Sequence, residues 1–566
     1  MEATASGPEG PAKPAKFGNE NVTVEIPVVL TVRESSPDEL ARTNDDIGGN
    51  SNHNNKDDHR RVKDDSGKSM EANSGVVFAH LFGMKLDARN APRLQGYGWN
   101  LGFQDHHSRS EKSIAWIISQ DEWRLLFDIY VQKIHPVYGF LDIETVCQIS
   151  LRRWQDVHAT NAYDHILCGV AALGSLFSLT RADDRERLLV ETAKELLDNT
   201  SMVRDPTFED AQAWLLRTLY LRCHSPPHAA WMASCTTMHV IEAIGAHQEA
   251  RKVSLVYSES KAPLEHTLGC QRRLFWLAKL LNSWISFEYG RSRVVLPGTS
   301  CQPPTPIEGR EEDCTTDLIS LFQISEILDP DTSPTPEDLE SALTCVHSLS
   351  FTLDPLVLSQ ANLAFTLYRR LNVAIPTGIS TVLLNKVMQL GFKGLTASSR
   401  ATDEGSPWWH VNNVPFQFSC ILLAMDTRVS LGYVRESVEV LRKVVERFKT
   451  SMAARALDTV ELLVMLAKRG KEVDAAVLGD CFREHTAGPS QGQAQIGESA
   501  DCAAQEAYVD TSNTTIDLHG QLAALNEAVH LMTNQTSLDW PVNMLAGAGV
   551  GSGCTNPVFN QRMQQM

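Results

Sequence analysis

Apolar residues in the middle of the chain recur at the three- and four-residue steps of α-helices. After residue 119 four of them follow these steps: Trp123, Leu126, Tyr130 and Ile134. Ser119 and Glu122 precede them in a capping-box pattern, and Pro136 ends the run. The spacing predicts a helix between Ser119 and Pro136 with one apolar face in a core.

A second helix is predicted after residue 204. Asp205 and Pro206 suit its N-cap and first position, with acidic residues in the turn that follows. Its apolar face comprises Phe208, Ala211, Leu215 and Leu219. Trp214 and Leu216 broaden this face, which is typical of a deeply buried helix.

The clearest amphipathic pattern lies near the end of the helical region. Residues 433–449 carry a single apolar stripe, and Glu439 and Lys443 are spaced as an ion pair one turn apart. The next helix is predicted over 453–469, ending at the Lys468-Arg469-Gly470 signal.

No stretch alternates apolar and polar residues between hairpin turns, so the sequence predicts an all-α fold. We expect one large helical-bundle domain over 77–483, with Pro- or Ser-rich loops inside it at 300–313 and 396–407. Residues 1–76 are rich in Gly, Pro, Asn, Ser and Asp, and 484–566 is a low-complexity tail. Both ends are predicted to be disordered.

Charge argues against direct binding to polyanions. Among the 566 residues, 51 Lys and Arg face 69 Asp and Glu, a net charge of −18. Neutralising phosphates requires a local surplus of cations, which this composition does not provide. The sequence also shows no secretory leader and no apolar run of about 20 residues, so we expect a soluble intracellular protein without a membrane segment.

The candidate chemical motifs do not form an active site. The 12 cysteines begin at Cys147, and no two have the C-x-x-C spacing of zinc or redox sites. Pro226 and Pro227 separate His224 from His228 and prevent one helix from carrying both. The sequence therefore predicts no catalytic residues, no bound metal and no cofactor.

Cations precede an aromatic cluster in the central region. Arg272 and Arg273 are followed by Leu-Phe-Trp at the expected start of a helix, and Arg291 and Arg293 come later. Such arginines either pair with core carboxylates or contact phosphate groups, and pairing is the commoner arrangement.

Four motifs, in order, resemble the fungal-specific transcription factor domain, also called the middle homology region of zinc-cluster regulators. They are Tyr130 to Leu141 with its His-Pro element, Ala229 to His247, Gln271 to the Pro303-Pro304 segment, and Pro415 to Thr427. The signature positions, which the resemblance implies to be structural, are His135, Pro136, Phe140, Trp231, Gly245, His247, Arg272, Arg273, Trp276, Gly290 and Arg291. The resemblance covers about residues 120–470.

The chain departs from the family pattern at three places. Asn282-Ser283 stands where the family has Asp and Arg, and Ser292 stands where Pro is usual. No cysteine precedes Cys147, so the six-cysteine zinc cluster that reads DNA in many members is missing from these residues. An upstream segment lost from the sequence and a regulator without its own reader both fit this departure.

The resemblance implies a nuclear transcription regulator that binds other regulators or coactivators and reaches DNA indirectly. It also implies control of a secondary-metabolite biosynthetic gene cluster. The alternative from another class is an all-α scaffold or small-molecule sensor that does not act at promoters.

The C-terminal tail carries one candidate interaction segment, between about Asp517 and Leu545. Leu518, Leu522, Leu525 and Val529 follow helical steps, and Leu538, Asp539 and Trp540 form an acidic and aromatic element. This pattern is typical of transcriptional activation segments. A helix over 517–532 that docks back onto the helical domain is equally consistent with it.

Overall fold

The computed structural model describes residues 61–63, 69–71, 75–87, 112–158, 162–179, 183–203, 205–249, 265–307, 309–310, 312–375 and 378–483. The chain divides into two units, Met1–Lys56 and Asp57–Met566, and every described residue belongs to the second. All of the predicted tail 484–566, including Leu538, Asp539 and Trp540, and most of 1–76 lie outside the described residues.

The described part is helical apart from one small strand pair. The helices are α1 (Gly75–Leu86), α2 (Gln120–Lys133), α3 (Ile143–Gln155), α4 (Asp164–Leu176), α5 (Asp183–Val203), α6 (Phe208–His224), α7 (Pro227–Ala243), α8 (Glu265–Glu288), α9 (Thr315–Ser325), α10 (Pro336–Ser348), α11 (Asp354–Ala374), α12 (Thr381–Asp403), α13 (Trp409–Met425), α14 (Arg428–Phe448) and α15 (Ser451–Arg483), with short 3-10 turns η1 (Ile114–Trp116) and η2 (Glu326–Leu328). Strands β1 (Arg61–Lys63) and β2 (Ser69–Glu71), which the sequence did not predict, pair antiparallel. The all-α prediction is confirmed, and none of the described helices is long and apolar enough to cross a membrane.

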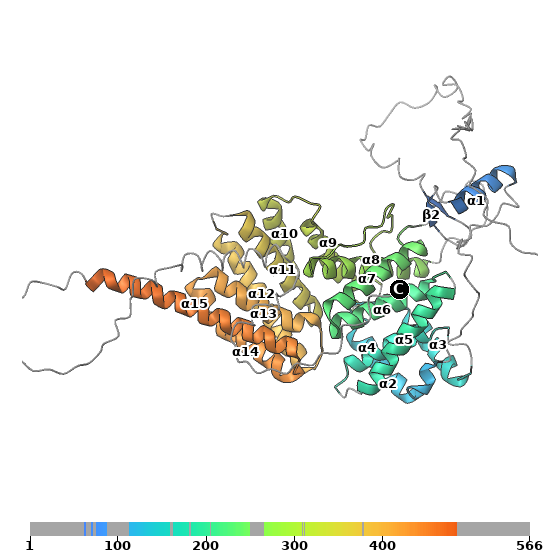
Figure 1. The fold of residues 1–566 in the computed structure, drawn as a ribbon, viewed down its shortest axis with the longest axis horizontal. Helices are drawn as coiled ribbons and strands as arrows, with labels where there is room; N and C mark the ends of the chain where they lie inside the picture. The colour runs from blue at the N-terminus through green and yellow to red at the C-terminus, as the bar shows by residue number, and fades with distance from the viewer. Residues whose placement is uncertain are drawn as a thin grey trace, which may run out of the picture. The chain divides into compact units, whose positions relative to one another are not determined.

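Helices close in sequence pack as neighbours. The tightest pairs are α4 with α5, α6 with α7, α11 with α12 and α13 with α14. Helix α9 contacts α8 on one side and α10 and α11 on the other, so it connects the earlier helices with the later ones (Figure 1). Short connections favour this arrangement, because a helix that turns back at once buries its apolar face against its predecessor.

One continuous core runs through these helices. Its largest fully buried side chains are Trp123, Tyr130, Phe140, Phe177, Phe275, Phe322, Phe365 and Phe418. Phe365 of α11 stacks on Phe418 of α13 with ring centroids 5.5 Å apart. A Cβ on Gly391 of α12 would lie 2.2 Å from the Phe418 ring, so only glycine allows this close approach.

Local capping signals explain where several helices begin. Ser119 and Glu122 form the predicted capping box of α2. The predicted N-cap at Asp205 is wrong, since Thr207 caps α6 and exchanges hydrogen bonds with Asp210. Thr427 caps α14 with Ser430, a neutral partner, and this helix therefore begins five residues before the predicted position 433.

Three further sequence predictions are corrected. Residues 396–403, predicted as loop, continue α12, because the Ser398 hydroxyl donates to the Val411 carbonyl (2.6 Å) and does not compete for its own helix. Lys443 does not pair with Glu439, since its amine lies 2.7 Å from a carboxylate oxygen of Asp403 on α12. Helix α15 does not end at Gly470 but continues to Arg483, as helix interiors tolerate glycine at a modest cost. The loop over the described part of 300–313 is confirmed.

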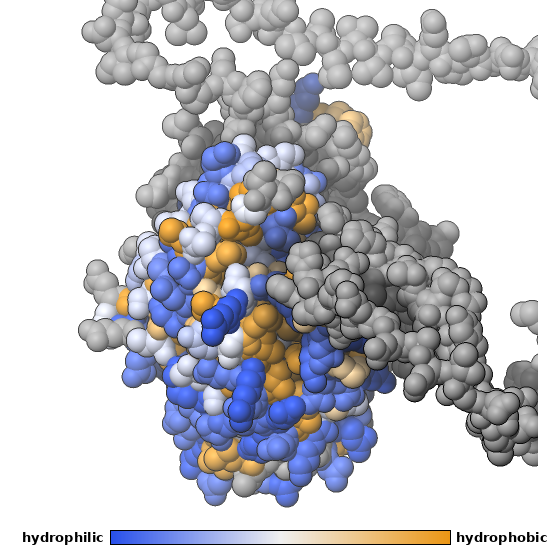
Figure 2. All heavy atoms as spheres, turned by 90° about the vertical axis from the view of Figure 1, so that its left-hand side faces the viewer, coloured by the Kyte–Doolittle hydropathy of each residue, from blue (hydrophilic) through white to orange (hydrophobic). Residues whose placement is uncertain are grey.

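Helix α15 stands out for its exposed apolar side chains. Over residues 451–479, whose burial the structure describes, only two apolar residues of α15, Ala453 and Val460, are fully buried. Figure 2, which views the end of the molecule toward which α15 extends in Figure 1, shows apolar side chains exposed among hydrophilic ones. This helix therefore offers surface that the rest of the described chain does not cover.

Candidate functional site

The signature residues lie on or next to α8. Arg272, Arg273 and Trp276 belong to it, and the others come from the segment after α2, from α7 and the turn after it, and from the turn after α8. Eight apolar side chains of α8 are buried: Leu274, Phe275, Trp276, Leu277, Ala278, Leu280, Leu281 and Ile285. The two arginines lie in the third turn of α8, not at its start as the sequence suggested.

Arg273 links the segment after α2 to the segment before α9 by hydrogen bonds. Its guanidinium donates to both carboxylate oxygens of Asp313, at 2.9 and 2.6 Å, and to the Gly139 and Thr305 carbonyls at 3.4 Å. Burial alone would raise the pKa of Asp313, but hydrogen bonds from Arg273 and Thr315 outweigh it and hold this pKa below its ordinary value. The planar fork of arginine suits such a bidentate contact.

Backbone hydrogen bonds complete this junction around the His-Pro element. The Cys314 amide donates to the Pro136 carbonyl at 2.8 Å, and the Gly139 amide donates to the Thr315 hydroxyl at 2.9 Å. Burial lowers the pKa of His135 to about 4, with smaller influences from Asp313, Arg310, Arg273 and Asp142. His135 is therefore a neutral packing residue at pH 7, and Phe140 beside it is completely buried.

Backbone hydrogen bonds and an ion pair of Arg272 stabilise the turn after α7. Gly245 has a φ of 71°, a left-handed conformation that glycine adopts without strain and that ends α7. The His247 carbonyl accepts the amides of Ser300 and Cys301 at 3.1 and 3.2 Å. Arg272 pairs with Glu249 at 2.6 and 3.0 Å.

The turn after α8 closes the same region. Gly290 has a φ of 59°, and the Arg291 amide donates back to the Ser286 carbonyl at 2.8 Å. The Arg291 guanidinium lies 5.9 Å from the centre of the Trp231 ring, whose N–H donates to the Ser292 carbonyl. Trp276 donates to the Cys301 carbonyl at 3.2 Å.

Asn282, where the chain departs from the family pattern, also has a structural role. Its amide nitrogen donates to the Ser234 hydroxyl at 3.0 Å, and its carbonyl accepts the Val294 amide at 2.8 Å. The side chain is 1% exposed. A buried group that must both donate and accept suits an uncharged amide.

A second buried cluster was not found by sequence reasoning. The side chain of Arg222 on α6 is fully buried, pairs with Glu288, and stacks 4.3 Å from the Trp409 ring of α13. Next to it His410 is 3% exposed, neither of its ring nitrogens has a partner among the described residues, and burial holds its pKa well below 6.5. The adjacent cavity, about 10 Å³, has room for about one water molecule. Only the run Trp408-Trp409-His410 hinted at this cluster.

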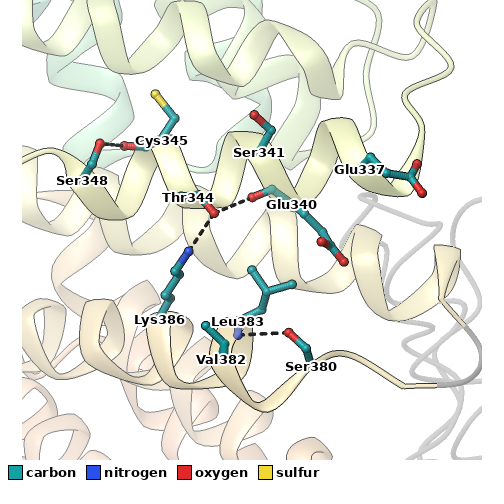
Figure 3. Close-up of a pocket in the computed structure, with 10 residues that line it drawn as sticks. All are labelled: Glu337, Glu340, Ser341, Thr344, Cys345, Ser348, Ser380, Val382, Leu383 and Lys386. Carbon is teal, nitrogen blue, oxygen red and sulfur yellow. Dashed lines mark hydrogen bonds between the residues drawn. The ribbon is translucent and has the colours of Figure 1, made fainter.

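One larger groove opens between α10 and α12 (Figure 3). It has a volume of about 630 Å³, and its lining includes Glu337, Glu340, Cys345 and Lys386. The Lys386 amine donates to Thr344 at 2.8 Å, and the Thr344 hydroxyl donates to the Glu340 carbonyl at 2.9 Å. These polar groups serve the helices themselves, and no catalytic constellation is formed there.

The described residues form neither a metal site nor a phosphate site at the positions that the sequence suggested. No group of three or more His, Cys, Asp or Glu side chains in them could hold a metal ion. His224 ends α6 and His228 lies in the first turn of α7, so the two prolines do separate them. Arg272 and Arg273 each face a carboxylate of the same chain.

Comparison with known proteins identifies the fold's family. Residues 127–373 match the fungal specific transcription factor domain. The chain is 49% identical to Transcription factor kojR of Aspergillus oryzae over 419 residues, which cover 74% of this chain and 75% of that protein. It is 34% identical to Protein RDR1 of Gibberella zeae over 420 residues (74% and 76%), and 31% identical to Protein RDR1 of Saccharomyces cerevisiae over 405 residues (71% and 73%). The resemblance predicted from the four motifs is thereby confirmed, and the chain belongs to the family of fungal transcription regulators built on this domain.

Proposed function

We propose that this regulator acts in the nucleus by binding other transcription regulators or coactivators, and that it reaches DNA through them. Family membership over about three quarters of the chain is the observation that carries this proposal. Within these 566 residues no cysteine precedes Cys147, so they cannot build the six-cysteine reader, and their net charge of −18 gives phosphates no general attraction.

The internal pairing of the α8 region supports a scaffolding role for this part of the domain. Arg272 and Arg273 are committed to Glu249 and Asp313, and Arg291 stacks on Trp231. Cations that are already paired gain little from a phosphate, because the carboxylate partner would be left without a counterion. Partner recognition is therefore assigned to other surfaces of the domain and to the tail.

A gel-shift titration with the purified 566-residue chain tests the indirect route. We expect no sequence-dependent complex with duplex DNA at physiological salt, while the tagged chain crosslinks to promoters in cells that contain its partner. A specific complex formed by the purified chain alone would overturn this route.

We further propose that the tail segment between about Asp517 and Leu545 activates transcription. It places Leu538 and Trp540 around Asp539 in an otherwise polar stretch, and such segments bind by burying a few large side chains in a coactivator groove. Residues 510–566 fused to an unrelated DNA-binding module should activate a reporter, and changing Leu538 and Trp540 to Ala should abolish this activity. Changing Val558 and Phe559, which belong to the fusion but lie outside the proposed segment, serves as the matched control, and a silent parent fusion ends the proposal.

The regulated genes are proposed to form a secondary-metabolite biosynthetic cluster, by analogy with the family. Deleting the gene and sequencing the transcripts tests this directly. We expect a contiguous block of biosynthetic genes to change together, whereas scattered changes without such a block would contradict it.

A further inference from the structure

The exposed face of α15 carries a stripe of apolar residues that the described structure covers only in part. Met452, Leu462, Met465, Leu466 and Val477 are between 41% and 62% exposed. At 100° per residue these positions fall on one side of the helix, while the buried Ala453 and Val460 fall on the opposite side. We call this set, together with Arg455 and Arg469 on the same side, the outer stripe.

Met452, Leu462, Met465 and Leu466 lie opposite the buried side of α15, whereas Val477 lies where both sides of the helix are exposed, since Leu478 is 65% exposed. The first four residues point away from α13 and α14, which are the helices that α15 contacts. Exposed apolar side chains in helical register are typical of a surface that binds another amphipathic helix.

The charged residues on the outer stripe indicate which kind of helix could bind to it. Arg455 and Arg469 are exposed, and neither forms an ion pair with any residue that the structure describes. By contrast, neighbouring charged groups on α15 are paired, Lys468 with Glu472 and Glu461 with Arg442. Asp458 is also exposed on this side, so the stripe carries two arginines and one aspartate, a surplus of one positive charge. Such a stripe fits an amphipathic helix with an acidic residue beside its apolar face.

The chain itself contains such a helix-forming pattern in the segment that follows α15, 33 residues beyond its end. Residues 484–566 hold eight acidic residues and one arginine, a net charge of −7. Within them Leu518, Leu522, Leu525 and Val529 follow 4, 3 and 4 residue steps, and Asp517 adjoins this apolar face. The 33 residues between Arg483 and Asp517 would span about 30 Å as a flexible linker, comparable to the length of the outer stripe, so the segment can reach back.

We propose that residues 517–532 bind as an amphipathic helix along the outer stripe of α15 in the same chain. Leu518, Leu522, Leu525 and Val529 would cover the apolar side chains of α15, and Asp517, the one acidic residue beside this apolar face, would meet Arg469. Tethering supplies an effective concentration in the millimolar range, so a weak contact suffices to close this interface. The inference concerns how the chain folds on itself, and it holds whether or not the segment activates transcription.

Hydrogen exchange of the full chain, read by mass spectrometry, tests the docking. We expect the amides of 517–532 to exchange at least tenfold more slowly than an unprotected peptide. The double variant Leu462→Asp/Leu466→Asp should bring them to the unprotected rate. Val382→Asp, at an exposed apolar site on α12, should leave the protection intact.

The arginines provide a second variant that leaves every apolar contact in place. Arg469→Glu should speed exchange of 517–532 about threefold, and raising the salt concentration should act in the same direction. Lys393→Glu, the same charge change at an exposed position on α12, is the control. Circular dichroism checks that α15 remains helical, and if the double Asp variant loses helicity, Arg469→Glu decides.

Three outcomes overturn the proposal. Unprotected amides over 517–532 in the unaltered chain would show that no docking occurs. Protection that survives both α15 variants would assign the segment to another surface. Protection that disappears on dilution would assign the outer stripe to a second copy of the chain. None of these results bears on promoter binding, which the gel shift and the crosslinking measure separately.

Discussion

Helices α8 and α15 are both long and rich in apolar residues, yet they are used in opposite ways. In α8 eight apolar side chains are buried, and Arg272, Arg273 and Lys279 all pair with carboxylates on neighbouring segments. In residues 451–479 of α15, the part with described burial, two apolar residues are fully buried, and apolar side chains line the outer stripe. Substitutions in α8 should therefore act on stability, whereas those on the outer stripe should act on contacts with other segments.

Arg273 offers the strongest test of this contrast. Replacing Arg273 with Met leaves the Asp313 carboxylate and the carbonyls of Gly139 and Thr305 without their donor. Breaking a buried ion pair on one side costs about 3–5 kcal/mol of unfolding free energy. We expect a loss of this size in urea denaturation.

The control for Arg273 is an arginine at the surface. Arg435 pairs with Glu439 one turn away on α14, and its side chain is 88% exposed. Arg435→Met should change the unfolding free energy by less than about 0.5 kcal/mol. Equal losses in the two variants would remove the distinction between the α8 region and the outer surface.

The pH dependence of stability gives the next largest effect. Burial sets the pKa of His135 to about 4 in the folded chain, against 6.5 for a free imidazole. Below pH 6.5 the unfolded chain binds a proton that the folded chain does not. The stability from neutral His135 is thus complete above pH 6.5 and decreases as the pH falls towards 4, by up to about 3 kcal/mol.

Substitution isolates this contribution from that of other titrating groups. The difference in unfolding free energy between pH 7 and pH 4.5 should be smaller in His135→Phe than in the unaltered chain. His239→Phe, at an exposed position on α7, should leave the difference unchanged. Parallel pH curves for the unaltered chain and His135→Phe would show that the imidazole is not desolvated.

Substitution of Asn282, where the chain departs from the family pattern, should lower the free energy of unfolding by a smaller amount. Restoring the family's carboxylate by Asn282→Asp removes the donor to Ser234, whose hydroxyl already donates to the Trp231 carbonyl. A buried carboxylate next to an oxygen that cannot donate should cost about 1–3 kcal/mol. Asn385→Asp, on the exposed surface of α12, should stay within about 0.5 kcal/mol in the same urea titration. A neutral result at Asn282 would mean that Ser234 reorients to donate.

Sequence reasoning succeeded where a signal is local and failed where the deciding contact is distant. The capping box of Ser119 and Glu122 spans three residues and was predicted correctly. The predicted pairing of Lys443 with Glu439 was wrong, because its partner Asp403 is 40 residues away and lies on another helix. The Ser-rich end of α12 was predicted as loop because polarity suggested exposure, whereas packing places Ala397 and Ala401 in the core. The same applies to the α8 region, since the motif identified Arg273 but not Asp313, 40 residues further on.

Substituting Gly470 has the smallest expected effect on the free energy of unfolding. Whether the substitution stabilises or destabilises the chain decides whether α15 is continuous. The sequence signal Lys468-Arg469-Gly470 predicted the end of the helix, whereas α15 continues for 13 residues beyond it. A Cβ added at Gly470 would meet no heavy atom within 4 Å. In a continuous helix with open space, Gly470→Ala should therefore stabilise by about 0.5–1 kcal/mol, since alanine loses less backbone entropy than glycine.

The same substitution would act differently if the helix ended at this residue. A helix end commonly places glycine in the left-handed conformation, and alanine there costs free energy. A gain in stability together with increased helical ellipticity supports a continuous α15, on which the part of the outer stripe beyond Gly470 depends. Gly245→Ala serves as the contrasting control, because Gly245 has a φ of 71° at the end of α7 and alanine should destabilise the chain there. If both variants destabilise the chain, α15 ends near Gly470, Val477 leaves the outer stripe, and only its first half remains to bind another segment.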